Sequence, residues 1–517
     1  MKIKSLFKNK KELISILFVL LLASILRLVN LGYSDYIGDE HKAFLIPEGN
    51  QTVWNFLIQQ RKGPMQFLVS YIPRIFIGNF NNELAERIPF ALISIACVYV
   101  FYILVKKLTK NHVIAISSTF LFMVNGFIVG FGRIAQYQNL NILFSLLAIY
   151  FYSDLLFKEK KLIRNTLFGT LFWCFSIMSH WDAVFIIPIV VWFFISFLKN
   201  NKFSIAYKIR VLIYNFLLGC LVLLPFMIPY VIFHLNNIPS SGYFERRIGF
   251  GYSNNKIYKM FIDLYNPFVT FWLLITLLFS ALVKFKKVAA YFVWFLFSYI
   301  LFELFVRKPG THIYNFLIPV FIISGFGFEY LLSRFKKKKF KIVFGALGLF
   351  IGAFLFYQSY LIFVDHRKEY PWAPEEYVVF EKGCDTFSDF CNKFDVVKMV
   401  FKTKEYYYDY EGQKLPLFGF PHSRNWDKIN DFINSLNAEN EKSLGYSSNE
   451  DQSVCAWYMD APYKSSGTFY FVGISRPTDF VVDPSPPHGS ERELIKNFVR
   501  EDGSVYAKVW LVRFSNK

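Results

Sequence analysis

Charged residues and cysteines are scarce in this chain of 517 residues, and several common motifs are missing. Only 18% of the residues are charged, against roughly 25% in soluble domains, while 54% are hydrophobic. This imbalance excludes an ordinary soluble globular protein, and the 63 Phe and 32 Tyr exclude a disordered or collagen-like chain. The six cysteines show no zinc-site spacing, and there is no Walker loop, dinucleotide fingerprint or internal repeat.

Apolar segments long enough to cross a bilayer recur along the chain. A spanning helix needs about 20 mostly apolar residues, because unpaired backbone amides are costly in hydrocarbon. The first apolar run is too long for a secretory signal and lacks a small-residue cleavage site, so we expect a retained helix. The sequence predicts a polytopic α-helical membrane protein with about eleven spans, of which the fifth and sixth are short: 13–30, 88–105, 112–131, 139–157, 166–179, 183–198, 211–233, 267–283, 288–306, 313–332 and 342–363.

Lysine and arginine gather in every second connection between these spans. Such residues collect on the cytoplasmic side of short loops, so the alternation predicts a cytoplasmic N-terminus and an extracytoplasmic C-terminal part. The net charge of +19 is then explained by topology, with anionic lipid as the alternative partner and no nucleic acid. For a prokaryotic cell the predicted location is the plasma membrane, and otherwise it is the endoplasmic reticulum. The basic stretches are 2–11, 106–110, 158–164, 199–210, 284–287 and 334–339.

The composition becomes more polar near residue 364, which divides the chain into a transmembrane domain, 1–363, and a soluble extracytoplasmic domain, 364–517. Within the second domain, 468–474 and 505–514 alternate like strands, whereas 426–437 has a helical pattern. We therefore expect a small C-terminal α+β domain. Oxidation is permitted outside the cytoplasm, so a disulfide between Cys384 and Cys391 is an option that leaves Cys455 unpaired.

Ionisable residues near the spans share one side of the membrane. Such residues are expensive in a bilayer and are candidates for function by default. A transporter would be expected to place them near the midplane, so their distribution favours a site at the outer leaflet, with interfacial snorkelling as the alternative for any single Arg. Those at predicted outer ends are Arg27, Arg87, Arg133, His180, Asp182, Glu303 and Arg307.

The loop after the first span contains two adjacent carboxylates, Asp39 and Glu40. A hydroxyl nucleophile must lose its proton during attack, and such a pair can act as the general base and its supporting group. Two other interpretations compete: Asp39 can cap a helix that begins at Glu40, or both can be solvated loop charges. The chemistry alone leaves all three open.

The Asp39–Glu40 pair after a first spanning helix resembles the signature of the GT-C superfamily of membrane glycosyltransferases. The branch it resembles contains the protein O-mannosyltransferases and aminoarabinose transferases. Many members carry an acidic residue shortly after the Arg of the third span, where this chain has 136–139, Gln-Tyr-Gln-Asn, so that role is not carried over. Other similar stretches follow in the family's order over roughly residues 11–363, namely 61–67, 82–90, 133–137 and 307–314.

The resemblance implies transfer of a sugar from a polyprenyl-phosphate donor to an acceptor hydroxyl on the outer face, with inversion. It makes Asp39 the expected base, and Glu40 the group that orients it or holds the acceptor. Cations would stabilise the departing phosphate. The candidates for this are Lys62, Arg307, Lys308 and His312, and the candidates for supporting roles are Arg87, Arg133, His180 and Asp182.

No cofactor or metal is predicted, although the sequence leaves a divalent metal open. The expected partners are membrane lipid, a polyprenyl-phosphate-linked sugar, and an acceptor protein, glycan or lipid. The absence of a phosphate-cradling loop agrees with a donor that reaches the outer face through the membrane. The main alternative is a flippase or transporter of lipid-linked sugars, for which eleven spans serve equally well. A scaffold that works through 364–517 is the third option, but eleven spans exceed what an anchor requires.

Overall fold

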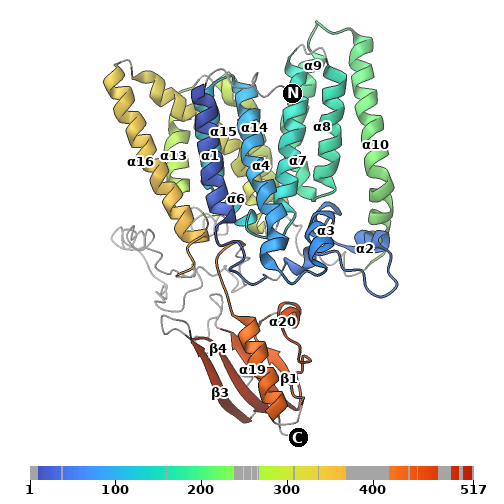
Figure 1. Ribbon diagram of the computed structural model, residues 1–517. Helices are drawn as coiled ribbons and strands as arrows, with labels where there is room; N and C mark the ends of the chain where they lie inside the picture. Colours follow the sequence, from blue (N-terminus) through green and yellow to red (C-terminus); the bar gives the residue numbers. More distant parts are fainter. Residues whose placement is uncertain are drawn as a thin grey trace. The chain divides into compact units, whose positions relative to one another are not determined.

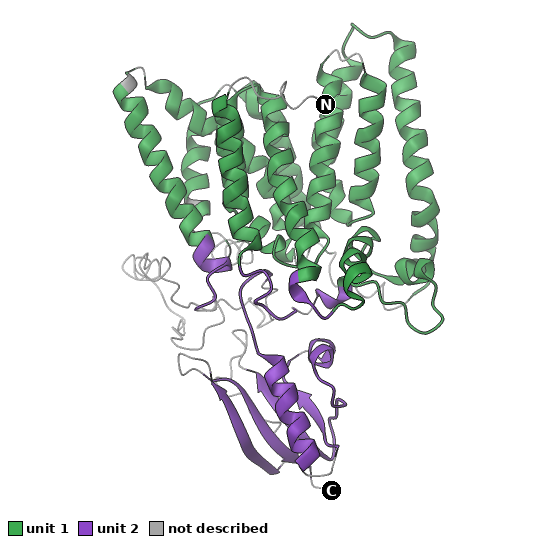
Figure 2. Ribbon diagram, in the orientation of Figure 1, with its two compact units in different colours: residues 1–29, 43–80, 85–359 green, residues 30–42, 81–84, 360–517 purple. Residues whose placement is uncertain are grey.

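The computed structural model describes most of the chain, and all statements below concern its described residues. These are 10–36, 39–157, 161–237, 249, 258, 265, 267–283, 285–306, 309–335, 337–367, 418–439, 443–450, 452–474, 491–499 and 505–514. The chain divides into two compact units (Figure 2). Unit 1 comprises residues 1–29, 43–80 and 85–359, and unit 2 comprises 30–42, 81–84 and 360–517.

Unit 1 consists of α-helices, most of which run side by side (Figure 1). Each of the eleven predicted spans lies on one helix or on a consecutive pair, so the predicted fold class is confirmed. The helices are α1 (Lys10–Leu28), α2 (Val53–Gln59), α3 (Met65–Ile77), α4 (Glu83–Thr109), α5 (His112–Val124), α6 (Gly126–Phe131), α7 (Gln138–Tyr152), α8 (Leu162–Ile177), α9 (Ile187–Leu198), α10 (Ile205–Leu235), α13 (Pro267–Ser280), α14 (Phe285–Phe305), α15 (Tyr314–Arg334) and α16 (Lys338–Phe363), with 3-10 turns η2 (His41–Ala43), η3 (Ser153–Leu156), η4 (Trp181–Ile186) and η5 (Gly310–Ile313).

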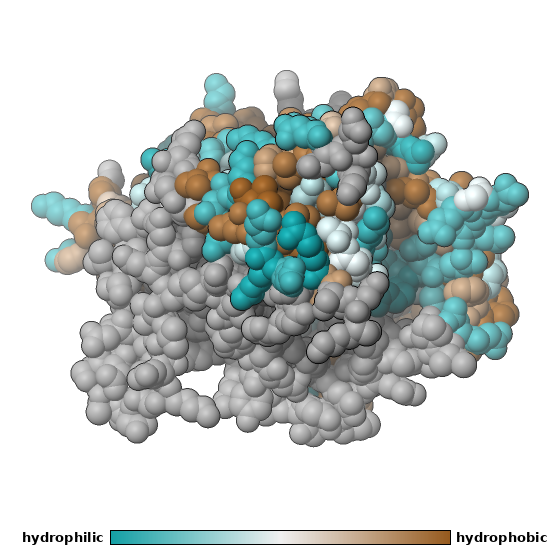
Figure 3. All heavy atoms as spheres, turned by 90° about the horizontal axis from the view of Figure 1, so that it is seen from below, coloured by the Kyte–Doolittle hydropathy of each residue, from teal (hydrophilic) through white to brown (hydrophobic). Residues whose placement is uncertain are grey.

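Seven helical segments among the described residues are long and apolar enough to cross a membrane. In α10 and α16 only 6% of the most apolar window is buried within the protein. Apolar faces of this length are stable in lipid and not in water, so the chain is a multi-pass membrane protein. Figure 3 shows a face on which hydrophilic and hydrophobic residues are mixed. The sides of α10 and α16, by contrast, expose many large apolar residues. The segments are Glu83–Thr109, Gln138–Leu156, Trp181–Leu198, Ile205–Leu235, Phe285–Phe305, Gly310–Arg334 and Lys339–Phe363.

Polar side chains fix the ends of several helices. The Asn111 side chain accepts from the backbone N–H groups that begin α5, and Asn125 does the same for α6. Lys106 pairs with Glu12 at 2.8 Å, and Lys107 pairs with Asp154. These two ion pairs connect α4 to α1 and η3. The basic residues in the last turn of α4 thus also hold the helices together. The orientation of the termini remains a prediction.

Unit 2 contains a four-stranded sheet of order β1-β2-β4-β3. The strands are β1 (Gly445–Ser448), β2 (Thr468–Ile474), β3 (Glu491–Val499) and β4 (Val505–Arg513), and the helices are α19 (Trp426–Glu439) and α20 (Gln452–Tyr458). β1 is parallel to β2, and the other two pairings are antiparallel. Ile429 and Ile433 of α19 pack with Tyr470 and Val472 of β2 in one core. The predicted helix and both predicted strands are confirmed.

The loop that contains Asp39 and Glu40 belongs to unit 2, together with the C-terminal part of the chain. The backbone N–H of Tyr36 donates to the Tyr458 hydroxyl at 2.7 Å, and that hydroxyl donates to Glu83 at 2.7 Å. Residues 30–42 and 81–84 are therefore fixed by hydrogen bonds to the C-terminal domain. The division into independent domains 1–363 and 364–517 stays a prediction. Cys455 is a free thiol, and Cys384 and Cys391 lie outside the described residues.

Candidate functional site

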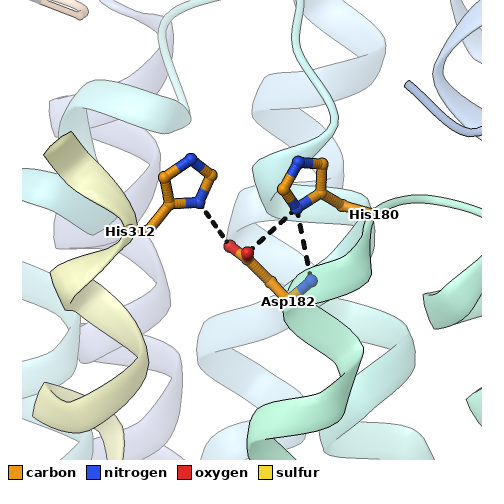
Figure 4. Close-up of side chains that lie close together, drawn as sticks. All are labelled: His180, Asp182 and His312. Atoms are coloured by element: carbon orange, nitrogen blue, oxygen red, sulfur yellow. Dashed lines mark hydrogen bonds and ion pairs between the residues drawn. The ribbon is translucent and has the colours of Figure 1, made fainter. Parts of the chain in front are cut away.

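In unit 1 a carboxylate lies between two imidazoles, and these three side chains are close enough together to hold a metal ion (Figure 4). Asp182 lies at the start of η4, two residues after His180, and His312 lies in η5. The Nδ1 atom of His180 is 2.9 Å from Oδ1 of Asp182, and the Nδ1 atom of His312 is 2.8 Å from Oδ2. Both rings thus point the same type of nitrogen at one carboxylate. We call these three residues the His-Asp-His cluster.

Neighbouring side chains orient the Asp182 carboxylate. Oδ2 also accepts a hydrogen bond from the Tyr314 hydroxyl at 2.7 Å and one from the Asn315 amide at 3.1 Å. The carboxylate is fully buried, and a buried charge is stable only when such partners replace water. Tyr137 stacks on His180 with ring centroids 4.0 Å apart. The cluster is therefore held in one arrangement by groups from three parts of the chain.

Burial lowers the pKa of His180 from its usual 6.5 to about 4, although the Asp182 charge acts in the opposite direction. At neutral pH the ring is therefore uncharged. The positive charges of His312, when protonated, and of Lys62 push the pKa in the same direction as burial. A neutral imidazole keeps a lone pair on one nitrogen, which can accept a hydrogen bond or bind a metal.

Lys62 lies beside this cluster because of how its own segment packs. Its ammonium is 5.3 Å from the centre of the Tyr137 ring, the ring that stacks on His180. The next residue, Gly63, touches the turn that leads to His180, and a Cβ atom there would lie 1.9 Å from the Met178 carbonyl oxygen. The backbone N–H of Met65 donates to that same oxygen at 3.3 Å. The structure thus brings Lys62, His180, Asp182 and His312 together.

The predicted arginines that the structure describes have structural partners. The Arg133 guanidinium donates to the carbonyl oxygens of Leu26 at 3.0 Å and Val29 at 2.9 Å, at the C-terminal end of α1. These oxygens lack partners within the helix, so Arg133 caps it. Arg87 is buried in α4. Arg307 and Lys308 lie outside the described residues.

Asp39 and Glu40 differ in exposure. The Asp39 side chain is 42% exposed and lies 3.5 Å from the ammonium of Lys42. Glu40 is fully buried. Both belong to unit 2, whereas the His-Asp-His cluster belongs to unit 1.

Sequence reasoning did not single out three residues that build the site. Tyr137 and Tyr314 each fall within a stretch that resembles the family, but nothing in the sequence pairs either ring with Asp182 or His180. Gly63 is followed by a proline, and this pair predicts a turn. It does not predict that the backbone at Gly63 packs closely against residue 178. Asp182 and Tyr314 are 132 positions apart, and only the packing of the helices brings them together.

Comparisons with known proteins show what this chain is similar to. No protein-family model and no curated protein matches the sequence. Among solved structures, ArnT from Cupriavidus metallidurans in the apo state matches with a TM-score of 0.52 and 10% identity, over 96% of this chain and 97% of that one. The S. cerevisiae protein O-mannosyltransferase Pmt1-Pmt2 complex bound to the sugar donor matches with a TM-score of 0.31 and 12% identity. That match covers 44% of this chain, which spans about a third, 34%, of the other chain.

At 10% identity, the likeness to ArnT concerns the fold alone, but it covers nearly the whole of both chains. It includes the helices of unit 1 and extends to the C-terminal sheet of unit 2. The chain has the fold of ArnT, so the resemblance that its sequence predicts is confirmed for the fold alone.

Proposed function

We propose that the chain is an integral membrane glycosyltransferase that moves a sugar from a polyprenyl-phosphate donor to an acceptor hydroxyl at the outer face of the membrane. The observation that carries this proposal is the shared fold with ArnT over 96% of the chain. The proposal includes a cytoplasmic N-terminus, an extracytoplasmic C-terminal domain and a location in the plasma membrane. The acceptor is a protein, a glycan or a lipid.

The donor joins an apolar tail to a charged phosphate, and unit 1 offers surroundings for both. The exposed apolar helices suit the polyprenyl chain, while the phosphate requires cations near the membrane surface. Lys62 and His312 are candidates for binding the phosphate because they lie close together. Lys62 is next to the Tyr137 ring, which stacks on His180, and His180 in turn stacks on His312. Arg307 and Lys308 are the other proposed donor ligands. Negative charge develops on the phosphate as the sugar departs, so the charges of Lys62, Arg307 and Lys308, together with a hydrogen bond from His312, lower the barrier.

In the proposed reaction, the acceptor hydroxyl attacks the anomeric carbon in line with the departing phosphate. The bond from the acceptor oxygen to the anomeric carbon forms, the bond to the phosphate oxygen breaks, and polyprenyl phosphate leaves. The single displacement inverts the anomeric centre. Asp39 takes the acceptor proton, and its partly exposed carboxylate beside Lys42 supports this role. Glu40, which is buried, would orient Asp39 or hold the acceptor.

The remaining candidates act in this proposal by holding other groups in place. Arg133 fixes the end of α1, directly before the loop that contains Asp39. Asp182 holds His312 through the contact at Nδ1, and His180 holds the Tyr137 ring by stacking. Arg87, which is buried in α4, is a further supporting residue in this proposal. None of these residues needs to touch the sugar.

The test uses purified protein in lipid with a panel of radiolabelled polyprenyl-phosphate sugars, and measures the transfer of label to an acceptor or to water. We compare wild type with Asp39→Asn. Asp431→Asn is the matched control, because Asp431 is an exposed acid on α19 of the same unit. The proposal expects turnover that is lost in Asp39→Asn and kept in the control.

Other outcomes of the test separate the alternatives. Turnover that survives in Asp39→Asn removes this residue as the base and leaves the class of enzyme intact. Movement of lipid-linked sugar between leaflets, without transfer from any donor, identifies a flippase instead.

A further inference from the structure

One oxygen of Asp182 lies close to an imidazole nitrogen but has no hydrogen bond of suitable geometry among the described residues. The Nδ1 atom of His180 accepts a hydrogen bond from the Asp182 backbone N–H at 3.3 Å, so this nitrogen presents a lone pair. The same atom lies 2.9 Å from Oδ1 of Asp182. Oδ1 is buried and receives no hydrogen-bond donor from the described residues. A metal ion bound between Nδ1 and Oδ1 would satisfy both atoms at once.

The other oxygen of Asp182 has the opposite imbalance. Oδ2 is approached by three potential donors, namely Nδ1 of His312 at 2.8 Å, the Tyr314 hydroxyl and the Asn315 amide. A carboxylate oxygen has two lone pairs, so it is saturated by two of these three groups. The Nδ1 atom of His312 therefore shares Oδ2 with two other donors, and its contact with Oδ2 is the one of the three that a metal ion would replace. Figure 4 shows both rings directed at the carboxylate from opposite sides.

We propose that His180, Asp182 and His312 bind a divalent transition-metal ion of the zinc type. Nδ1 of each imidazole and Oδ1 of the carboxylate are the ligands, and one ligand atom from each residue lies within 4.8 Å of the others. Two imidazoles and one carboxylate are a set that suits Zn²⁺ and its neighbours in the first transition row. Mg²⁺ and Ca²⁺ prefer oxygen ligands.

Small movements complete the geometry, and the metal ion replaces the Asp182 backbone N–H as the partner of Nδ1 of His180. Ligand atoms in a tetrahedral zinc site lie about 3.3 Å apart, given bonds of about 2.0 Å, so the carboxylate must withdraw slightly from both nitrogens. Each neutral ring then carries its hydrogen on Nε2. Tyr314 and Asn315 keep their hydrogen bonds to Oδ2 and hold the carboxylate in place, as groups around metal ligands commonly do.

Three protein ligands leave a fourth position open for an oxygen ligand. The ammonium of Lys62 lies 5.3 Å from the centre of the Tyr137 ring that stacks on His180, and its charge opposes a second cation unless an anion lies between them. The phosphate of the donor is such an anion. This last point rests on the proposed function, whereas the metal site itself does not.

The test measures the metal content of the full chain, purified in lipid without a polyhistidine tag. The protein is stripped with a chelator, exposed separately to Zn²⁺, Mn²⁺ and Co²⁺, desalted and analysed by mass spectrometry. We expect about one Zn²⁺ per chain in wild type, and affinity reduced at least tenfold in His180→Ala, His312→Ala and Asp182→Asn. His112→Ala is the control, because that imidazole pairs with Ser15 and Tyr102 elsewhere in unit 1 and should leave binding unchanged.

A variant that keeps a ligand separates metal binding from folding. His312→Cys should still bind Co²⁺ and add a sulfur-to-cobalt charge-transfer band to its absorption spectrum. Folded wild type that binds none of the three ions overturns the proposal, and so does equal metal content in wild type and in all three ligand variants. If wild type binds the metal ion but transfers sugar from no donor, the result counts against the proposed function and not against the metal site.

Discussion

Nδ1 of His312 lies 2.8 Å from Oδ2 of Asp182, although 130 positions separate these residues in the chain. Asp182 is in η4, directly before α9, and His312 is in η5, directly before α15. The contact therefore joins the starts of two apolar helices that are not consecutive. A substitution of Asp182 should therefore change the arrangement of these two helices and weaken the binding of any ligand near them.

Tyr314→Phe should destabilise the protein by about 1 to 2 kcal/mol, because it removes a hydrogen bond to a buried charge and leaves the volume nearly unchanged. The measurement is thermal unfolding in detergent at a fixed lipid content. Tyr291→Phe is the control, since Tyr291 is a buried residue that lies against Phe326 in the same unit. Equal losses in the two variants would show that the Tyr314 hydroxyl contributes nothing particular.

Gly63→Ala should weaken donor binding at least tenfold and lower the melting temperature. A Cβ atom at this position would lie 1.9 Å from the Met178 carbonyl oxygen, and backbone on both sides must move to relieve the clash. The movement shifts Lys62 away from Tyr137. Donor titration in the transfer assay gives KM, and unfolding gives the stability.

Gly345→Ala provides the control for this change. Gly345 lies in α16, and a Cβ atom there meets nothing within 4 Å. In a helix this substitution is neutral or stabilising by up to about 1 kcal/mol. If Gly63→Ala behaves in the same way, then the contact between residues 63 and 178 is not what positions Lys62.

The helices could be predicted because lipid imposes a simple requirement, namely an apolar run that satisfies its own backbone hydrogen bonds. Each of the eleven predicted spans lies on helical structure. This includes the two short spans, 166–179 and 183–198, on either side of the 180–182 turn. The helix α19 and the strands β2 and β4 were also predictable from their periodicity. The local sequence pattern is sufficient to predict a helix or strand when one face of that element lies in lipid or in the core and differs in polarity from the other.

Contacts between distant residues could not be predicted in this way. His180 and Asp182 were candidates from the sequence, but their pairing with His312 depends on where η4 and η5 meet. The association of residues 30–42 with the C-terminal part depends on scattered hydrogen bonds and ring contacts, such as those between Tyr36 and Tyr458. One sequence contains no periodic signal for such pairs.

Lys42→Ala should leave stability within about 1 kcal/mol of wild type, because its ion pair with Asp39 is exposed on both sides. Asp39→Asn should be equally benign for folding but should lower kcat by a factor of roughly 10² to 10⁴, as expected for the loss of a general base. Thermal unfolding and transfer kinetics of both variants separate the two effects. A large drop in stability for Asp39→Asn would instead indicate a structural role.

Tyr458→Phe should loosen the loop that contains Asp39. The Tyr458 hydroxyl accepts from the Tyr36 backbone and donates to Glu83, so its removal leaves both groups without this partner. We expect a loss of about 1 to 3 kcal/mol and a slower transfer rate. Hydrogen exchange of residues 30–42 should rise in the variant. Unchanged protection there would show that the loop is fixed by other contacts.

The same hydroxyl predicts a difference at high pH. Burial, and then the charges of Asp35 and Glu83, raise the pKa of Tyr458 well above its usual 10. Above pH 10 the unfolded chain releases this proton while the folded protein keeps it, so the unfolded state binds fewer protons and stability falls as the pH rises. Wild type should therefore lose more stability than Tyr458→Phe when the pH rises through 10. Parallel curves for the two proteins, measured by thermal unfolding across this range, would contradict the predicted rise in pKa.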